Sequence, residues 1–210
     1  MKYNVARVAQ CDSTSCASAN YTMVANALNL PVGLRDILRV THGTLGQAQF
    51  WNYLLDKGAK IKCISKNDYR SWAAGGADEW SKKTPEWVYR FFAERSNDKL
   101  RSTTALFRKI FKNKNFDFTH RAPSADDLQK LFDDGYALEV MGDGWLMYGD
   151  KPKEQLLHRV FITDIDKNVV FFHDPASDGE SNHRAKMSDI MAALSVDGAE
   201  VVGYKIKDKI

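Results

Sequence analysis

The sequence has little cysteine, little proline and no recognisable metal-binding pattern. Only 3 of its 210 residues are cysteine and 5 are proline. Three thiols are an odd number and too few for a disulfide framework, so we expect them to be reduced. The five histidines form no HxxxH or HExxH pattern, and no second pair of Cys or His has metal-ligand spacing. We therefore expect no metal and no other cofactor.

Long apolar runs are also lacking. No stretch approaches the ~20 apolar residues that a membrane-spanning helix needs. The first seven residues, Met1 to Arg7, lack the apolar core of about 7 to 15 residues that a secretory signal carries. We expect no membrane association and a cytoplasmic location by default, with export by a signal-less route left open.

Neither sign of charge is in large excess. The chain has 30 Lys and Arg against 27 Asp and Glu, a formal net charge of +3. This balance is too mild to indicate nucleic acid, and no nucleic-acid partner is expected. The basic residues concentrate between residues 66 and 121, a segment that contains 13 basic and 7 acidic residues. An acidic partner is a hypothesis for this segment.

What is present is typical of a globular chain. Hydrophobic residues make up 44% and charged residues 27% of the sequence. No period of 20 to 50 residues repeats, which excludes solenoids. The length suits one domain, so we expect a single domain over residues 1–210.

The first 65 residues predict helices followed by a strand. A helix is expected from Ser15 to Leu28, because apolar residues recur there at helical spacing without Gly or Pro. This places Cys16 in its first turn. Shorter helices are expected over Leu34 to Val40 and Gly46 to Lys57, and a strand over Lys60 to Ile64.

Residues 66–121 have a different composition, with many aromatic residues between Lys and Arg. Helical periods occur in Glu86 to Glu94 and in Thr104 to Lys112. A basic aromatic surface for nucleic acid is one interpretation. We favour amphipathic helices with aromatic residues in the core, because no nucleic-acid-binding motif accompanies them. The segment is expected to be a helical insertion.

The last ninety residues carry the clearest signals. Ser124 to Asp127 is a capping box that opens a helix, and Gly135 ends that helix. The following elements are expected in order: a strand over Tyr136 to Met141, a turn at Gly142 to Gly144, a hairpin of strands His158 to Asp164 and Val169 to His173 joined by Asp166 to Asn168, a helix over Met187 to Leu194 with Ser188 or an earlier polar residue as cap, and a strand over Glu200 to Ile206. The whole predicts an α+β fold.

The expected hairpin brings a histidine and a carboxylate together. His158 and Asp174 are sixteen residues apart across it. Residues at such positions are opposite or diagonal neighbours, with Cβ atoms on the order of 4.5 to 8 Å apart. A carboxylate that accepts one ring N–H fixes the imidazole tautomer and leaves the other nitrogen for a nucleophile. Read alone, the pair is also consistent with a surface histidine and a turn-forming Asp before Pro175.

Cys16 and Gln10 complete a candidate catalytic set. A thiol in the first turn of a helix lies where backbone N–H groups and the helix dipole stabilise a thiolate. Gln10 lies six residues earlier. Its side-chain amide, together with the Cys16 backbone N–H, is suited to stabilise the oxyanion formed in acyl transfer. The simpler interpretation makes Cys16 a small core residue and Gln10 a polar surface residue.

The combination resembles a known family. Gln10, then Cys16 opening a helix, and a late hairpin from His158 to Asp174 that ends in the His-Asp-Pro sequence at 173–175 are similar to the papain-like cysteine peptidases. The closest likeness is to the bacteriocin-processing, double-glycine-leader branch. It covers roughly residues 5–65 and 120–206.

The resemblance implies a fold and a set of roles. An N-terminal helical part would pack the nucleophile helix on a C-terminal antiparallel sheet, with 66–121 as the helical insertion. Cys16 would be the nucleophile, His158 the general base and then acid, Asp174 the orienting carboxylate and Gln10 the oxyanion donor. The implied activity is that of a cysteine hydrolase, a peptidase or amidase that forms a thioester with a peptide or protein substrate.

Three features depart from the family pattern. Ala17 stands where the family usually has Gly after its cysteine, and residues 66–121 have no counterpart. Leader-processing members are commonly fused to a membrane transporter, and this sequence has no membrane segment, so a leader substrate is not implied.

Alternatives remain open at this point. An acyltransferase or transpeptidase would use the same triad, and a catalytically inactive peptide-binding domain would share the fold. Cys11, next to Gln10, is an alternative nucleophile, whereas Cys63 is expected in the core. His173 is expected on the opposite strand face, as a structural or rim residue.

Overall fold

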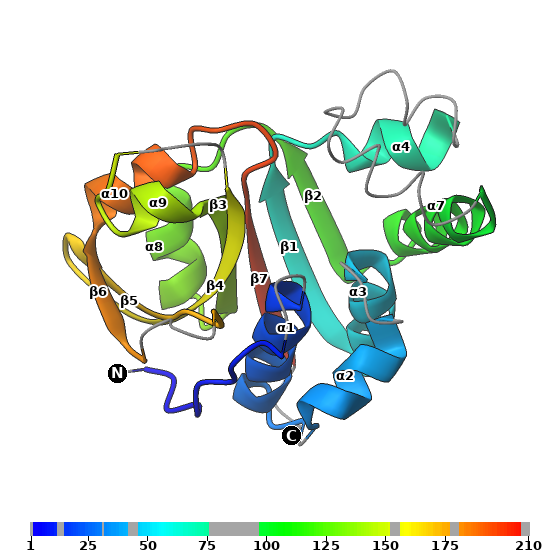
Figure 1. The fold of residues 1–210 in the computed structure, drawn as a ribbon. Helices are drawn as coiled ribbons and strands as arrows, with labels where there is room; N and C mark the ends of the chain where they lie inside the picture. Colours follow the sequence, from blue (N-terminus) through cyan, green and yellow to red (C-terminus); the bar gives the residue numbers. More distant parts are fainter. Residues whose placement is uncertain are drawn as a thin grey trace.

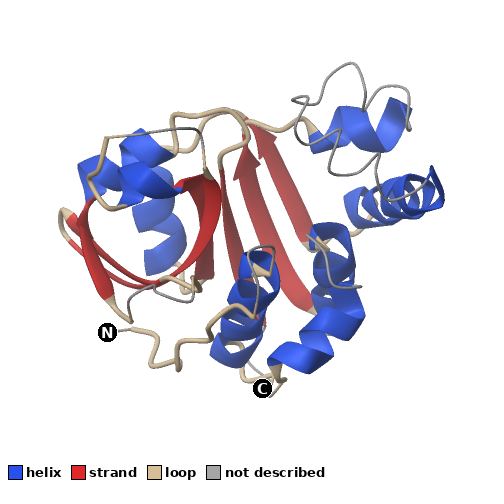
Figure 2. Cartoon of the chain, in the orientation of Figure 1, coloured by secondary structure: helices blue, strands red, loops and turns tan. Residues whose placement is uncertain are grey.

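The fold is an α+β arrangement of helices on both faces of one mixed sheet (Figure 1). The computed structural model describes residues 2–11, 15–30, 32–41, 46–75, 97–151, 156–176 and 181–206. Figure 2 shows the sheet at the centre with helices on either side. Among the described helices, none has both the length and the apolar character needed to span a membrane.

Seven strands form the sheet in the order β2-β1-β7-β3-β4-β5-β6. Only β1 and β2 pair in parallel among these strands, so the sheet as a whole is mixed. The strands from β3 to β7 pair antiparallel, as expected for the C-terminal part of the sheet. The strands are β1 Ala59–Ser65, β2 Phe116–His120, β3 Ala137–Asp143, β4 Leu157–Asp166, β5 Val169–His173, β6 His183–Lys186 and β7 Glu200–Ile206.

Eight helices occur in the described residues. The three helices expected before residue 58 and the helices expected after the capping box and near residue 187 are all present, within one or two residues at most ends. The helices are α1 Cys16–Ala27, α2 Leu34–Thr41, α3 Gln47–Asp56, α4 Tyr69–Gly75, α7 Asn97–Phe111, α8 Ala125–Asp133, α9 Gly144–Met147 and α10 Met187–Ala193.

Apolar side chains point alternately to the two faces of the sheet along the central strands, so the protein has two apolar cores, one on each face. In β7, Val202 belongs to the core shared with α1, α3 and α7, whereas its neighbour Val201 belongs to the core shared with α8 and α10. Phe161 and Ile162 of β4 divide in the same way. Successive side chains of a strand point to opposite faces, so both faces need a helical cover.

The segment at 66–121 is only partly helical. Its end forms β2, which pairs in parallel with β1 at the edge of the sheet. Tyr69, Trp72 and Phe107 are buried in the same core as α1. The expectation of a helical insertion is therefore wrong for this strand, while the interpretation of aromatic residues as core holds for these three. The helix expected over Glu86 to Glu94 lies outside the described residues.

The C-terminal half follows the predicted pattern with three differences. The capping box is confirmed, with the Asp127 backbone N–H donating to the Ser124 hydroxyl. The turn expected at 142–144 is instead the end of β3 followed by α9. Strand β6 was not expected. The N-cap of helix α10 is Lys186, an earlier polar residue and not Ser188, and its side chain makes no capping hydrogen bond.

Candidate active site

Helix α1 presents Cys16 at its first turn, as predicted. Ser15 precedes the helix, and Cys16 is its first residue and partly exposed. The next nine residues, Ala17 to Ala25, are all buried, because α1 packs on β3 and β4 beneath it. A helix held this firmly fixes the position of the thiol relative to the sheet.

The β4–β5 hairpin brings His158 and Asp174 into contact. Val169 pairs with Asp166, and a register shift near Thr163 leaves Phe161 opposite His173. His158 and Asp174 are therefore diagonal neighbours at the open end of the hairpin. The His158 Nε2 atom donates to Asp174 Oδ1 at 2.7 Å, with side chains only 13% and 4% exposed. The predicted pairing of these two residues is present in the structure.

Asp174 is held by more than the histidine. Its Oδ1 also accepts from the Ala176 backbone N–H at 2.7 Å, and its Oδ2 accepts from the Tyr148 hydroxyl at 2.6 Å. Burial raises the pKa of Asp174, but the hydrogen bonds from His158, Tyr148 and Ala176 and the attraction to His158 outweigh it, so the pKa lies below its usual value. The carboxylate is the stable form at neutral pH.

His158 links Asp174 to Cys16. Because Nε2 is occupied by Asp174, Nδ1 is the ring nitrogen left to face the thiol. Burial lowers the pKa of His158, but side-chain hydrogen bonds to Asp174 and to Cys16, with the negative charge of both groups, raise it to about 9. The imidazole is therefore protonated at neutral pH, as a thiolate–imidazolium pair requires.

The N-terminal segment carries Gln10 to the same place. Arg7 donates through Nε to the Asp174 carbonyl at 2.6 Å and through a second nitrogen to the Ala176 carbonyl. The Gln10 backbone N–H donates to the Pro175 carbonyl at 2.7 Å. Gln10 is partly buried, and its side-chain Oε1 has no hydrogen-bond partner among the described residues.

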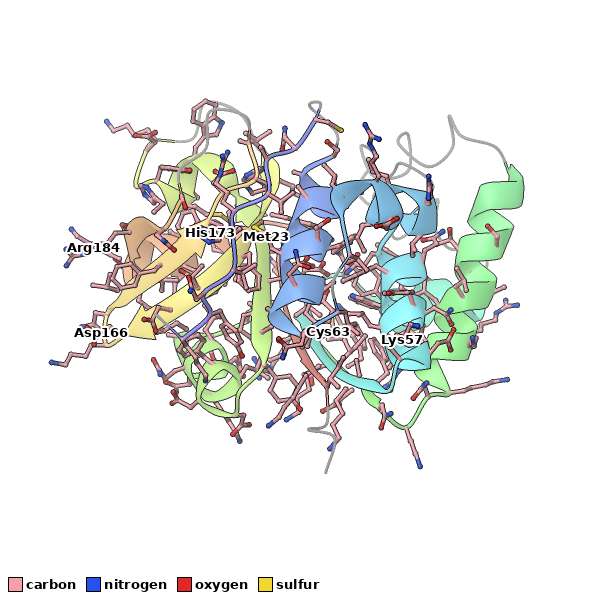
Figure 3. The ribbon with its side chains drawn as sticks, turned by 90° about the horizontal axis from the view of Figure 1, so that it is seen from below. Met23, Lys57, Cys63, Asp166, His173 and Arg184 are labelled. Atoms are coloured by element: carbon pink, nitrogen blue, oxygen red, sulfur yellow. The ribbon has the colours of Figure 1, made fainter. Side chains whose placement is uncertain are left out.

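His173 fastens this segment further along. Its Nε2 donates to the Val5 carbonyl at 2.8 Å, and its Nδ1 accepts from the Asn182 backbone N–H at 3.0 Å. Figure 3 labels His173 on its strand, with the N-terminal segment running alongside. Burial is the main reason why the pKa of His173 lies below its usual value, and nearby Arg7 also lowers it. The neutral His173 ring therefore has a structural role, because it holds the N-terminal segment that carries Gln10.

The other two cysteines differ from Cys16 in their surroundings. Cys11 is exposed and outside the helix, with its backbone N–H donating to the Ser15 hydroxyl at 3.0 Å. Cys63, labelled in Figure 3, is buried in β1, and burial raises its pKa well above the ordinary value. Its predicted core position is confirmed.

A buried ion cluster lies between α1 and the sheet. Arg159 donates to Glu139 and, at 2.9 Å, to Glu200, and these three side chains are at most 3% exposed. Asn20, one turn after Cys16, donates to Glu139 at 2.8 Å. Burial is the main reason why the pKa of Glu139 lies above its usual value, although Arg159 lowers it. The cluster joins the helix of Cys16 to the residue that follows His158.

Sequence reasoning missed Tyr148 and the buried ion cluster. Tyr148 reaches Asp174 from 26 residues away, at the end of a four-residue helix that is too short to show a helical period in the sequence. Arg159 and Glu139 occupy strand positions that a single sequence assigns to a polar face. Only the pairing of β3 with β4 and β7 brings their charges together.

No family model matches this chain, and no curated protein does so either. Among the described residues, no group of three or more His, Cys, Asp or Glu side chains is placed to hold a metal ion. The assignment of function therefore depends on the geometry of the site.

Proposed function

We propose that the protein is a cysteine hydrolase, acting on an amide or peptide bond through Cys16, His158 and Asp174. The observation that carries the proposal is the single imidazole that is hydrogen-bonded to Asp174 and interacts electrostatically with Cys16. A papain-like architecture fits the same arrangement, because a nucleophile-bearing helix packs on a sheet whose hairpin supplies the histidine and the carboxylate.

The reaction has two halves. The Cys16 sulfur attacks the substrate carbonyl carbon, and the negative charge on the oxygen is stabilised by the Cys16 backbone N–H and the Gln10 side-chain N–H. His158 then gives its proton to the leaving amine as the C–N bond breaks, which leaves a thioester on Cys16. In the second half His158 takes a proton from water as the water oxygen attacks the thioester carbon. The C–S bond then breaks, which releases the carboxylic acid and restores the Cys16 thiolate beside the protonated His158.

The supporting side chains have defined parts in this scheme. Asp174 keeps Nε2 of His158 protonated, so that Nδ1 exchanges the proton with sulfur and with the leaving group. Gln10 is held next to Pro175 by its backbone, which brings the proposed oxyanion donor to the residue that follows Asp174. A double-glycine leader is not part of this proposal.

The proposal is tested by turnover of a peptide library by the wild type and by Cys16→Ala. We expect cleavage by the wild type and none by Cys16→Ala, with unchanged circular dichroism. Cys11→Ala is the matched control and retains activity. Equal activity of Cys16→Ala would overturn the proposal. Added hydroxylamine separates hydrolysis from acyl transfer, because an acyltransferase gives hydroxamate as its main product.

A further inference from the structure

We infer that Tyr148 is a positioning residue of the proposed active site, whose hydroxyl holds the Asp174 carboxylate in the orientation that His158 requires and favours a carboxylate over an amide there. The inference rests on the proposed function and names a residue outside the triad. It is carried by the hydrogen bonds that Asp174 accepts and by the way the chain fixes the Tyr148 ring.

The backbone around α9 fixes where Tyr148 lies. Asp143, the last residue of β3, is 1% exposed, and its Oδ1 accepts from the backbone N–H groups of Trp145 and Leu146. Tyr148 closes this short helix by donating its backbone N–H to the Trp145 carbonyl at 3.2 Å. Gly149 follows with φ of 74°, a conformation that glycine adopts without strain.

Two aromatic neighbours hold the ring without help from the hydroxyl. The Tyr148 ring meets Phe172 of β5 edge-on, with centroids 5.9 Å apart, and lies 4.3 Å from the ring of His183 in β6. Replacing Tyr148 by Phe keeps both contacts. The substitution therefore removes the hydrogen bond to Asp174 and leaves these two ring contacts in place.

The hydrogen bonds at position 174 are matched to a carboxylate. His158 Nε2 and the Ala176 N–H both donate to Oδ1, so an acceptor is required there. Tyr148 donates to Oδ2 at 2.6 Å, so both carboxylate oxygens act as acceptors. An amide with its oxygen toward His158 would turn its NH2 group to the Tyr148 oxygen, which can accept it, so the change would replace a hydrogen bond to a charged acceptor by a neutral one. Hydrogen bonds to an ionised acceptor are about twice as strong as neutral ones.

Removing the Tyr148 hydroxyl is expected to weaken the hydrogen-bonded pair of Asp174 and His158. Among the described residues, the titratable groups that face Asp174 and His158 are Cys16 from α1 and Tyr148 after α9, while the hydrogen bonds of Arg7 go to the backbone carbonyls of Asp174 and Ala176. Without the Tyr148 donor the pKa of Asp174 rises, because that bond lowers it. A carboxylate held less firmly supports the imidazolium less, so the pKa of His158 falls. The pH range of activity therefore becomes narrower, because its acidic limit rises with the pKa of Asp174 and its basic limit falls with the pKa of His158.

The test is Tyr148→Phe, with Tyr136→Phe as the matched control. The Tyr136 ring packs against Lys62, Lys205 and Gly203, away from the triad. We expect kcat to fall about tenfold in Tyr148→Phe with little change in KM, the size of effect of a hydrogen bond to a charged group. In a background with Asp174→Asn the same change costs about twofold or less, because the charged acceptor is gone.

The readout that needs no substrate is the titration of the His158 ring by nuclear magnetic resonance. Its midpoint is expected to move to lower pH in Tyr148→Phe and to stay unchanged in Tyr136→Phe. An unchanged midpoint in folded Tyr148→Phe overturns this inference alone, with turnover still dependent on Cys16. Failure of the proposed function has a different result, namely equal turnover by the wild type and Cys16→Ala.

Discussion

Replacing Arg159 by methionine is expected to destabilise the protein severely, because it leaves two buried carboxylates without their cation. Glu139 and Glu200 are both 0% exposed, and each accepts a hydrogen bond from Arg159. Removing one partner of a buried ion pair costs about 3–5 kcal/mol. At about 2–4 °C per kcal/mol for a chain of this size, the melting temperature should fall by about 6 to 20 °C.

The loss should depend on pH in a defined direction. The pKa of Glu139 is already raised by burial, and Arg159 is the main group that lowers it. Without Arg159 the folded pKa of this carboxyl rises further above the unfolded value of about 4.3. A carboxyl group whose pKa is higher in the folded than in the unfolded protein destabilises the folded state when it is ionised, and this cost disappears as the group is protonated. The destabilisation relative to wild type is therefore smaller at pH 5 than at pH 8.

Urea unfolding at pH 5 and pH 8 measures both effects. Arg121→Met is the matched control, because Arg121 is 48% exposed and pairs with Asp127, whose pKa it lowers to about 2. An exposed pair of this kind is worth about 1 kcal/mol or less. Adding Glu139→Gln and Glu200→Gln to Arg159→Met should remove the pH dependence. A loss below about 1 kcal/mol at pH 8, or an equal loss at both pH values, would refute the reasoning.

Three further outcomes follow from the geometry. Asp174→Asn should reduce kcat/KM less than His158→Ala, because an amide oxygen still orients the ring; equal losses would give the carboxylate a structural role. Activity should fall above about pH 9 as the His158 imidazolium loses its proton, and a basic limb near pH 6.5 would contradict this. Gly142→Ala should cost about 1–3 kcal/mol in thermal unfolding, since its Cβ would lie 2.6 Å from the Ala193 carbonyl oxygen, whereas Gly33→Ala, where the new Cβ has room, should change little.

The local parts of the fold were predictable from sequence. The helix that begins at Cys16, the capping box at Ser124 and the β4–β5 hairpin each depend on residues close together in the chain, so periodicity and turn residues define them. The same locality made the contact between His158 and Asp174 predictable, and the turn lies at Lys167 and Asn168, between the paired residues Asp166 and Val169. Lys167 takes φ of 56° there.

The parts that were missed depend on non-local pairing. Strand β2 is five residues long and half-exposed at the sheet edge, so the alternation of Phe116 and Phe118 with polar residues is too short to separate it from the helical segment before it. Its parallel pairing with β1 requires a crossover connection that includes α7, so the two strands are far apart in the sequence. The Tyr148 contact and the cluster around Arg159 likewise arise from strands and helices far apart in sequence. Residue types at these positions carry no local indication of their partners.

The most direct test of the proposed active site is the rate of iodoacetamide alkylation of each cysteine between pH 4 and 9, read by peptide mass spectrometry in the wild type and in His158→Ala. An ordinary thiol, with a pKa of about 8.5, is almost wholly protonated at pH 5. We predict that Cys16 alone reacts fast at pH 5, and that it loses this advantage in His158→Ala. If Cys16 reacts at pH 5 no faster than exposed Cys11, no thiolate–imidazolium pair exists and the account of the site is wrong.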